Sequence, residues 1–469
     1  MPSALLMVSE AGRRNVLLAS VLGSSLAPFM VSALVVALPA VADEFGAGAA
    51  SLGLLTNVFF LSAAAFLVPL GRIADRSGVK KVFLAGLAVY LLSSLLSTLA
   101  PSLPFLIAAR FVTGIGGGMI FGTSIALLSL AFPESERGRA IGINVTGMFA
   151  GFLLGFLLGG VLTFYAGWRS IFAVTVPVEL LAIGIVLGLV RGECELSRRR
   201  GLDLAGMVLY PLSLLVLMTG FSMLPDLPGV AITGCGAAVL ALFVLRELRT
   251  GEPVLDLRLL ARNRTFALAA LAALLFNISN FAVIFLLSLY LQDLRGFDAR
   301  FSGLILLTLV IFMALLSAHA GRRSDRTSPR VVIGTGVALS TAGLLVLTFL
   351  DGTTPVPVLV LALAVMGTGF AFFQSPLLRT LVSSVPREMF GLASGLAETM
   401  RLVGMTASIA IATILLRGGI GGVHVTPAVL PGFVGAVRLT FWIFTGISLA
   451  ALVVVLFLGD RPVSGGDAG

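Results

Sequence analysis

The sequence predicts an all-α membrane protein with about fourteen transmembrane helices, and two observations lead to this fold class. First, 58% of the residues are hydrophobic and only 11% are charged, which gives a mean hydropathy of +1.09. Soluble globular chains carry about 25% charged residues. Second, the apolar residues form continuous runs of the length that crosses a bilayer as a helix, rather than the alternating pattern of a membrane β-barrel. We therefore expect a chain whose solvent is mostly lipid.

The apolar runs divide the chain into fourteen predicted spans. They lie at 15–41, 51–71, 80–100, 104–131, 139–163, 170–190, 204–223, 229–246, 265–290, 302–320, 330–350, 357–381, 390–416 and 432–458. The first run exceeds 20 residues and follows Arg13 and Arg14. A secretory signal has a shorter apolar core and a small-residue cleavage site. We therefore interpret this run as a first span that is retained.

The basic residues predict the orientation of the spans, because cytoplasmic loops carry an excess of Lys and Arg. With the N-terminus inside, 24 of the 31 basic residues fall in cytoplasmic segments, four fall outside and three fall within spans. Inverting the topology or removing one span abolishes this bias. We expect a multi-pass protein of the cell (inner) membrane with both termini in the cytoplasm.

Several functional classes are excluded by residue content. The net charge of +9 would suit nucleic acid, but the basic residues are dispersed among short loops without interleaved aromatic residues. Cys194 and Cys235 are predicted in a loop and a helix, so no disulfide is expected. The chain has no phosphate-binding loop, and its two histidines, His319 and His424, are far apart. Neither an enzyme, nor ATP hydrolysis, nor a metal site, nor a cofactor is expected.

An internal repeat appears at an offset of 250 residues. The segment GRIADRSGVKKV (71–82) follows the second span, and GRRSDRTSPRVV (321–332) follows the tenth. Gly114 and Gly116 are likewise echoed by Gly367 and Gly369. The predicted domains are an N-terminal six-helix bundle (1–200), two inserted helices with a cytoplasmic linker (201–264) and a C-terminal six-helix bundle (265–469). We expect a substrate path between the two bundles.

The repeated loop carries a pattern of charges that could act as a conformational latch. Its predicted members are Gly71, Asp75, Arg76, Lys80, Gly321, Asp325 and Arg326. Gly71 would allow a close helix approach, and Asp75 would accept hydrogen bonds at a helix N-terminus and pair with arginines. The first copy resembles the G-x-L-A-D-R-x-G-R-K signature of the major facilitator superfamily. The alternative is a solvated loop that serves topology only, which the second copy disfavours.

Glycines mark two of the predicted spans. Arg110 precedes Gly114, Gly116, Gly117 and Gly118, which resembles the superfamily's R-x-x-x-G pattern, and an arginine within a membrane is functional by default. The alternative is that Arg110 extends outward to the interface. A seam of helix-packing glycines follows in the next span, at Gly147, Gly151, Gly155, Gly159 and Gly160. It resembles the antiporter signature of the superfamily, except that Phe156 stands where a proline normally follows.

Three further stretches narrow the resemblance: PFMVSALVVALP (28–39), GWRSIFAVTVPVEL (167–180) and EPVLDLRLL (252–260). With fourteen spans, the chain resembles the fourteen-helix drug/proton antiporters of the major facilitator superfamily, which include multidrug exporters. The resemblance covers nearly the whole chain and implies two six-helix bundles with an inserted pair. Met30 stands where the family's first span often carries an acid, so a proton carrier would need its acid elsewhere.

Two of the 22 acidic residues lie well inside predicted spans, namely Glu179 and Glu398. Glu398 shares a helical face with Arg401 and is expected to pair with it and stay ionised. Glu179 lacks an evident partner, so it should hold a proton while shielded and release it when hydrated. Glu179 is therefore the better candidate for proton coupling. The alternative is a neutral carboxyl in helix packing.

Other residues within the spans are candidates for a substrate cavity. They are Met30, Asn57, Arg110, Asn144, Asn277, Asn280, Gln374 and Arg401. Amides within lipid need partners, so each is either a contact between helices or part of a cavity wall. The 33 phenylalanines and 13 methionines would suit an adaptable apolar pocket, although most will contact lipid.

The sequence and its resemblance together favour export of hydrophobic or amphipathic small molecules by alternating access, driven by the proton gradient. One alternative is a lipid or metabolite carrier or a uniporter of the same fold, given Met30 and Phe156. Another is a membrane sensor or scaffold that has lost transport. The expected partners are a small-molecule substrate, protons and membrane lipid, without nucleic acid, and the chain is expected to be a monomer.

Overall fold

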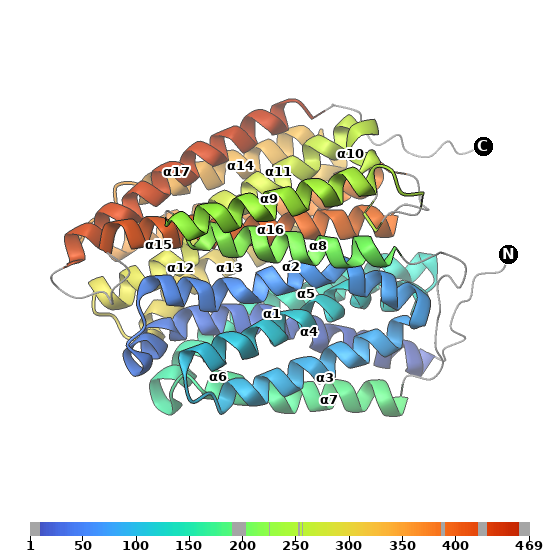
Figure 1. The fold of residues 1–469 in the computed structure, drawn as a ribbon, viewed down its shortest axis with the longest axis horizontal. Coiled ribbons are helices and arrows are strands. Elements are labelled where there is room, and N and C mark those ends of the chain that lie inside the picture. Colours follow the sequence, from blue (N-terminus) through green and yellow to red (C-terminus); the bar gives the residue numbers. More distant parts are fainter. Residues whose placement is uncertain are drawn as a thin grey trace. The chain divides into compact units, whose positions relative to one another are not determined.

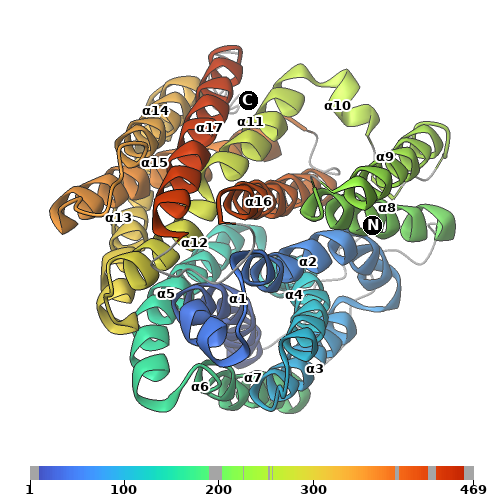
Figure 2. The same cartoon turned by 60° about the vertical axis from the view of Figure 1, so that its left-hand side comes forward.

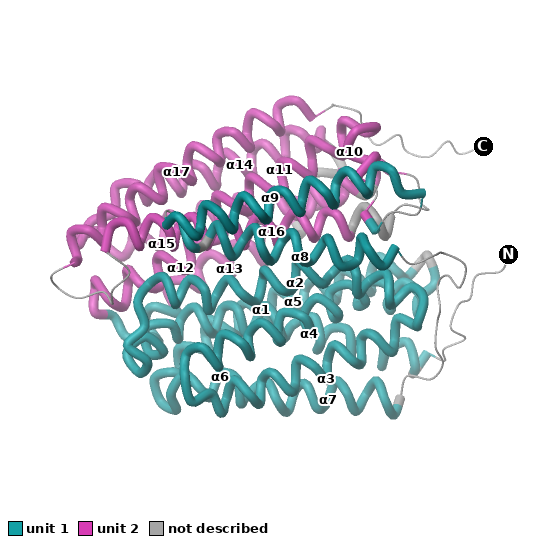
Figure 3. Tube along the Cα trace, in the orientation of Figure 1, with its two compact units in different colours: residues 1–254, 297–303 teal, residues 255–296, 304–469 magenta. Residues whose placement is uncertain are grey.

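The computed structural model describes residues 10–189, 203–224, 226–251, 254–255, 257–385, 390–420 and 429–458. Within these ranges every regular element is a helix (Figures 1 and 2), which confirms the all-α membrane fold. The chain forms two compact units (Figure 3), unit 1 from residues 1–254 and 297–303 and unit 2 from residues 255–296 and 304–469.

Unit 1 contains the first nine helices. They are α1 (Glu10–Phe45), α2 (Ala49–Ser77), α3 (Val79–Thr98), α4 (Leu103–Ala131), α5 (Glu134–Ala166), α6 (Ser170–Ala173), α7 (Thr175–Leu189), α8 (Leu204–Ser222) and α9 (Leu227–Glu247). Helix α13 (Ala299–Arg326) has its first residues in unit 1 and continues in unit 2 from Leu304.

Unit 2 holds the other helices. They are α10 (Arg258–Arg262), α11 (Arg264–Asn280), α12 (Ala282–Leu289), the π-helix η1 (Tyr290–Leu294), α14 (Pro329–Leu347), α15 (Val356–Ser383), α16 (Phe390–Ile420) and α17 (Leu430–Leu456). The domain division at 200 and 264 stays a prediction, but the inserted pair α8 and α9 groups with unit 1.

The fourteen predicted spans are confirmed, because fourteen helical segments of the described chain are long and apolar enough to cross a membrane. Two of them are interrupted. The sixth consists of α6 and α7, and the ninth consists of α11, α12 and η1. At the break in the ninth span, the hydroxyl of Ser408 accepts the backbone N–H of Ala282 at 2.9 Å. A backbone donor freed by the interruption is thus satisfied inside the unit, as lipid requires.

The glycine seam of α5 packs directly on α1. A Cβ at Gly147 would meet Cγ1 of Val21 at 2.6 Å, and one at Gly159 would meet Cα of Ala33 at 2.6 Å. Between them, Cβ atoms at Gly151 and Gly155 would overlap the backbone carbonyls of Ser25 and Phe29. Gly160 faces the start of α13 instead, where a Cβ would lie 2.7 Å from the carbonyl oxygen of Ala299. The lack of side chains at these glycines therefore sets the distance between α5 and the helices packed on it.

A hydrogen bond crosses the same seam. Ser32 of α1 donates its hydroxyl hydrogen to the backbone oxygen of Phe152 on α5 at 3.0 Å, and this oxygen lies between the seam glycines along the chain. Phe156, which replaces the expected proline, is fully buried, and α5 runs through this position without interruption.

The inserted pair is held to unit 1 through α2. The phenol of Tyr210 on α8 donates to the carbonyl oxygen of Ala64 on α2 at 3.0 Å. Asp203 caps α8, because its carboxylate accepts the N–H of Gly206 at 3.0 Å, and it also pairs with Arg246 of α9 at 2.7 Å.

The internal repeat is visible in helix packing. In unit 1, a Cβ at Gly116 of α4 would lie 2.9 Å from the backbone nitrogen of Tyr90 on α3. In unit 2, a Cβ at Gly369 of α15 would lie 2.7 Å from the backbone nitrogen of Ser340 on α14. Tyr90 and Ser340 are 250 residues apart, the offset of the repeated loop. The two units thus use the same close contact at equivalent positions.

Candidate coupling and binding residues

Glu179 lies on α7 and is fully buried inside unit 1. Its Oε1 accepts the hydroxyl hydrogen of Ser94 on α3 at 2.8 Å, and the hydroxyl of Thr175 approaches the same Ser94 oxygen at 3.4 Å. Its Oε2 has no hydrogen-bond partner among the described residues. Within the described ranges, Glu179 therefore has one neutral hydrogen-bond donor, Ser94, and no cationic partner.

Arg110 on α4 is 1% exposed, so it does not extend to the interface as the alternative reading allowed. Its Cζ lies 4.8 Å from the ring centre of Phe59 on α2, which is a cation–π distance. Its Nε and Nη1 have no hydrogen-bond partner in the described part of the chain. Arg110 is therefore a buried cation that pairs with no carboxylate of the described residues.

Tyr90 lies on α3, the helix that packs against both α4 with Arg110 and α7 with Glu179. It is fully buried, and it lies within electrostatic reach of both charged groups. Its phenol oxygen has no hydrogen-bond partner within the described ranges. Tyr90, Arg110 and Glu179, with Ser94 and Thr175, are called the Tyr90 cluster below.

The glycines after Arg110 explain how α2 and α3 come close to it. A Cβ at Gly117 would lie 3.2 Å from the Phe59 ring, and one at Gly116 would touch the backbone of Tyr90. Gly114 lies against the carbonyl oxygen of Phe59, too close for any side chain. Because these three glycines have no side chains, α2 packs closely on α4 at Phe59 and α3 packs closely on α4 at Tyr90.

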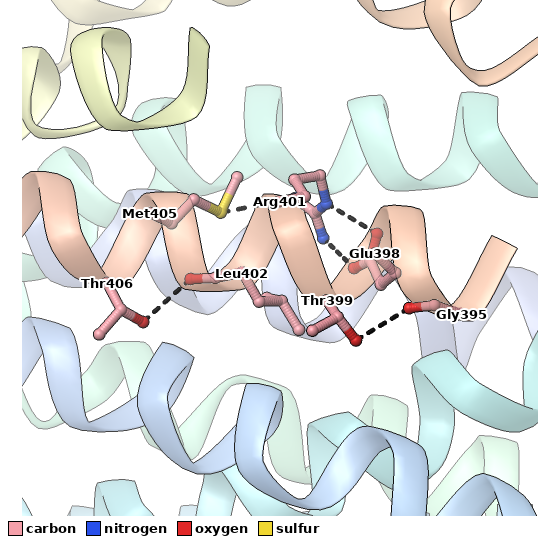
Figure 4. Close-up of polar contacts among 7 residues, drawn as sticks. All are labelled: Gly395, Glu398, Thr399, Arg401, Leu402, Met405 and Thr406. Carbon is pink, nitrogen blue, oxygen red and sulfur yellow. Dashed lines mark hydrogen bonds and ion pairs between the residues drawn. The ribbon is translucent and has the colours of Figure 1, made fainter. Parts of the chain in front are cut away.

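Glu398 and Arg401 form an ion pair on α16 in unit 2 (Figure 4). Arg401 donates from Nε to Glu398 at 2.8 Å and from Nη2 to the second carboxylate oxygen, and its Nη1 contacts Sδ of Met405 at 3.6 Å. The two side chains are 20% and 28% exposed. Figure 4 also shows Thr399 and Thr406 directed to the opposite face, where each bonds to its own helix. The pair thus lies on an accessible face of unit 2.

The other predicted cavity residues are mostly buried. Met30, Asn57, Asn144, Asn277 and Asn280 are all at most 3% exposed, whereas Gln374 is half-buried. Asn277 and Asn280 donate to the carbonyl oxygens of Ala273 and Phe276 in their own helix, at 2.8 and 2.9 Å. The Oδ1 atoms of Asn57 and Asn144 have no partner in the described regions. In this structure these five residues pack between helices, and none faces an open surface.

The predicted latch is described in its first copy. Asp75 and Lys80 are half-buried and both take part in polar contacts, and Arg76 is exposed. Next to them, Arg72 donates from Nε and Nη2 to the carbonyl oxygen of Val254, both at 3.2 Å. A Cβ at Gly71 would meet nothing within 4 Å, but a Cβ at Gly122 of α4 would lie 3.9 Å from Cα of Gly71, so α2 and α4 run close together at this glycine. In the second copy a Cβ at Gly321 would lie 3.8 Å from Oγ of Ser375, and the side chains of Asp325 and Arg326 lie outside the described residues.

No group of three metal-binding side chains occurs among the residues that the structure describes. Charged groups inside the described helices include the buried Glu179 and Arg110 in unit 1 and the partly exposed Glu398–Arg401 pair in unit 2.

The family of the chain follows from comparison with known proteins. Residues 20–409 match the model of the Major Facilitator Superfamily. The chain belongs to the major facilitator superfamily. Solved structures of the superfamily share its fold: a bacterial homologue of the human lysosomal transporter Spinster has a TM-score of 0.70 at 17% identity, with 96% of this chain and 97% of that chain covered. A D-xylose–proton symporter gives 0.67 at 14% identity, with 95% and 98% covered.

Relatives within the superfamily include exporters. The multidrug resistance protein Stp of Mycobacterium tuberculosis is 32% identical over 382 residues, which cover 80% of this chain and 71% of that protein. The tetracenomycin C resistance and export protein of Streptomyces glaucescens is 27% identical over 433 residues, with 90% and 80% covered. The riboflavin transporter RibZ of Clostridioides difficile is 22% identical over 439 residues, with 92% and 95% covered. The fold and family are those of transporters.

Sequence reasoning on this major facilitator chain missed Tyr90 and Ser94. Both belong to α3, and neither stands out in the sequence, because one buried tyrosine and a pair of serines are common in membrane helices. A usable signal existed in their spacing. Tyr90 and Ser94 are four residues apart, as are Thr175 and Glu179, so each pair shares one face of its helix.

Proposed function

We propose that this chain exports hydrophobic or amphipathic small molecules by alternating access and that the proton gradient drives the export. The similarity to a multidrug resistance protein and to an antibiotic export protein supports the substrate class. The observation that carries the coupling is Glu179, a fully buried carboxyl with a single neutral hydrogen-bond donor. A carboxyl in such a place is stable when protonated and becomes costly when ionised.

The proposal assigns different roles to the two embedded carboxyl groups. Glu179 carries the coupling proton, because no cation holds its charge when the unit is closed around it. Glu398 is assigned to a fixed pair with Arg401, because two hydrogen bonds join its carboxylate to the guanidinium. The exposed part of that ion pair suits either contact with a polar group of the substrate or a fixed structural role on α16.

We also propose that the protein lies in the cell membrane with its N- and C-termini in the cytoplasm. The distribution of 24 of 31 basic residues supports this orientation. In that arrangement the end of α2 that carries Asp75 faces the cytoplasm, and we assign it the role of a latch between transport states.

A second candidate function is a lipid or metabolite carrier, or a uniporter, that works without proton coupling. The similarity to a riboflavin transporter favours it, as does the buried Met30 at a position where related antiporters often carry an acid. In this case Glu179 is a neutral packing residue and transport runs only downhill.

Transport by the purified protein in proteoliposomes tests the proposal. A panel of amphipathic drugs and of water-soluble metabolites, riboflavin included, is offered with and without an imposed pH gradient. Export of drugs against their gradient only when a pH difference is present supports the proposal. Downhill movement of a metabolite that ignores the pH difference supports the second candidate and rejects the first.

The Glu179→Gln variant separates coupling from binding in the same assay. The amide keeps the size of the carboxyl and an acceptor for Ser94 but cannot release a proton. We expect loss of pH-driven accumulation with downhill exchange preserved. If this variant still concentrates a drug, the proposed role of Glu179 is wrong.

A further inference from the structure

Three buried side chains of unit 1 carry polar atoms that no hydrogen bond satisfies among the described residues. They are Oη of Tyr90, Nε and Nη1 of Arg110, and Oε2 of Glu179. All three residues are at most 1% exposed. A buried polar group without a partner destabilises a structure by about 1–3 kcal/mol. The guanidinium can donate a hydrogen bond to the phenol, and the phenol can donate one to the carboxylate.

Helix α3, which carries the phenol, packs against both helices that carry the ionisable groups, α4 and α7. Tyr90 lies one turn before Ser94 on α3, and Ser94 holds the carboxyl of Glu179 against this helix through the 2.8 Å hydrogen bond. On the other side, Gly116 brings the backbone of α4 against the backbone of Tyr90. Arg110 and Glu179 both act electrostatically on Tyr90, but no ion pair joins them within the described chain.

The repeat shows what a satisfied arrangement at this position looks like. Ser340, the counterpart of Tyr90 in unit 2, donates its hydroxyl hydrogen to Oδ1 of Asn280 at 2.6 Å. Gly116 and Gly369 are 253 residues apart, and the same offset places the buried Leu363 at the position of Arg110. The equivalent place in unit 2 therefore has a neutral, hydrogen-bonded hydroxyl. Among the described residues, unit 1 instead carries a cation, a phenol and a carboxyl there, and Oη of Tyr90 and Oε2 of Glu179 have no hydrogen-bond partner.

We propose that Tyr90 links Arg110 to Glu179 in a hydrogen-bonded chain that forms when Glu179 loses its proton. In the linked state Arg110 donates an N–H to the Tyr90 oxygen, and Tyr90 donates its hydroxyl hydrogen to the Glu179 carboxylate. A phenol can accept and donate at the same time, so one residue serves both contacts. The state described here is the unlinked one. The inference rests on the proposed role of Glu179 as the proton carrier and names the positioning residue of that site.

The charges balance in this exchange. The proton of Glu179 leaves to water, the carboxylate gains the Tyr90 donor, and the positive charge of Arg110 gains a nearby anion through the phenol. No other ionisable side chain lies in the middle of the helices concerned. The ionisable residues of α1 and α2 lie near the ends of those helices, α6 has none, and Lys80 and Lys81 lie at the start of α3. Arg110 is the only charged residue of α4, and Glu179 is the only one of α7.

Infrared difference spectroscopy of the full chain in lipid nanodiscs tests the inference without any substrate. The protonated carboxyl band of Glu179 is assigned by its loss in Glu179→Gln and is followed as a function of pH. The test variant is Tyr90→Phe, which removes the hydroxyl and keeps the ring. The matched control is Tyr210→Phe, a second buried phenol of unit 1, whose hydroxyl donates to the carbonyl oxygen of Ala64.

We expect the Glu179 band to disappear with rising pH in the parent protein and to persist to higher pH in Tyr90→Phe. A hydrogen bond to a charged group contributes about 1.5–3 kcal/mol, so the midpoint should move up by about one to two pH units. Tyr210→Phe should leave the midpoint unchanged. In the parent protein with isotopically labelled tyrosine, a phenol band should change over the same pH range, and this change should vanish in Glu179→Gln.

The inference is overturned if the midpoint in Tyr90→Phe equals that of the parent, if Tyr210→Phe shifts it equally, or if the Glu179 band does not titrate. The labelled parent protein decides the matter if Tyr90→Phe does not fold, because an unchanged phenol band then rejects the link. Proteoliposome transport separates this result from the proposed function. A Tyr90-dependent titration together with transport that ignores the pH gradient would reject proton-driven export and keep the Tyr90 link.

Discussion

Replacing Gly155 by alanine tests whether the close contact of α5 with α1 stabilises unit 1. The new Cβ would overlap the carbonyl oxygen of Phe29 and would lie 3.1 Å from its carbonyl carbon. This carbonyl belongs to the backbone of α1 and cannot turn aside, so the two helices must separate. Separation would also weaken the hydrogen bond from Ser32 to the Phe152 oxygen, which is 3.0 Å long in the parent protein.

The expected loss follows from these two contacts. Overpacking a core by a methyl group costs about 1–3 kcal/mol, and a weakened buried hydrogen bond adds about 1 kcal/mol. Alanine favours the helix over glycine by about 1 kcal/mol, which offsets part of the loss. We therefore expect Gly155→Ala to lower the free energy of unfolding by about 1–3 kcal/mol.

The assay is equilibrium unfolding of the purified protein in mixed detergent micelles, followed by circular dichroism. Gly142→Ala is the matched control, because Gly142 lies on the same helix and a Cβ there would meet nothing within 4 Å. This control should be neutral or slightly stabilising. A Gly155→Ala protein as stable as the parent, or a control that loses as much stability, would refute the idea that the glycine seam sets this contact.

Three further predictions concern charged residues. Glu398→Gln should lower the free energy of unfolding by about 2–3 kcal/mol and impair transport, because it leaves Arg401 without its partner on a face that is only partly exposed. Asp75→Asn should slow transport in proteoliposomes with little effect on unfolding, if the loop acts as a latch. Asp298 caps α13, and the Phe301 N–H and the Arg300 guanidinium lower the pKa of its carboxyl. The stability it provides should be present above about pH 4 and lost as the pH falls further, and Asp298→Ala should destabilise by about 1 kcal/mol at neutral pH.

Each of these predictions has its own contradicting result. For Glu398, the Glu398→Gln, Arg401→Gln double variant should recover stability but not transport, and a double variant as unstable as the single one would show that the unpaired charge is not the cause. For Asp75, Glu136→Gln serves as an exposed-carboxylate control, and equal slowing in both would reject the latch. For Asp298, an Asp298→Ala protein whose acid unfolding curve parallels that of the parent would exclude the cap.

The spans and the short-range contacts could be predicted from the sequence. Fourteen apolar runs of helix length leave few alternatives in a bilayer, and Glu398 pairs with Arg401 because three residues along a helix place side chains on one face. The glycine spacing of α5 likewise marks a face that only another helix can cover. These inferences depend on one helix at a time, so periodicity is enough for them.

Contacts between helices that are far apart in the sequence could not be predicted. Ser94 and Glu179 are 85 residues apart, and nothing in either helix indicates that these faces meet. The same holds for Trp168, which donates its indole N–H to Glu44 at 2.7 Å across 124 residues, while Arg169 pairs with the same carboxylate at 2.7 Å. Which face of a helix meets which neighbour is decided by the whole bundle.

The contact between α1 and α5 also bears on how the protein is made. The hydrogen bond from Ser32 to Phe152 joins residues 120 positions apart, so the first helix is complete long before its partner exists. At synthesis rates of about 5–20 residues per second, α1 waits in the membrane for roughly 6–24 seconds before α5 follows. During this time the face of α1 that later packs against the α5 glycines contacts lipid or the insertion machinery instead. The contact between α1 and α5 can therefore form only after the fifth span is made, and a ribosome stalled between the two would leave α1 without this partner.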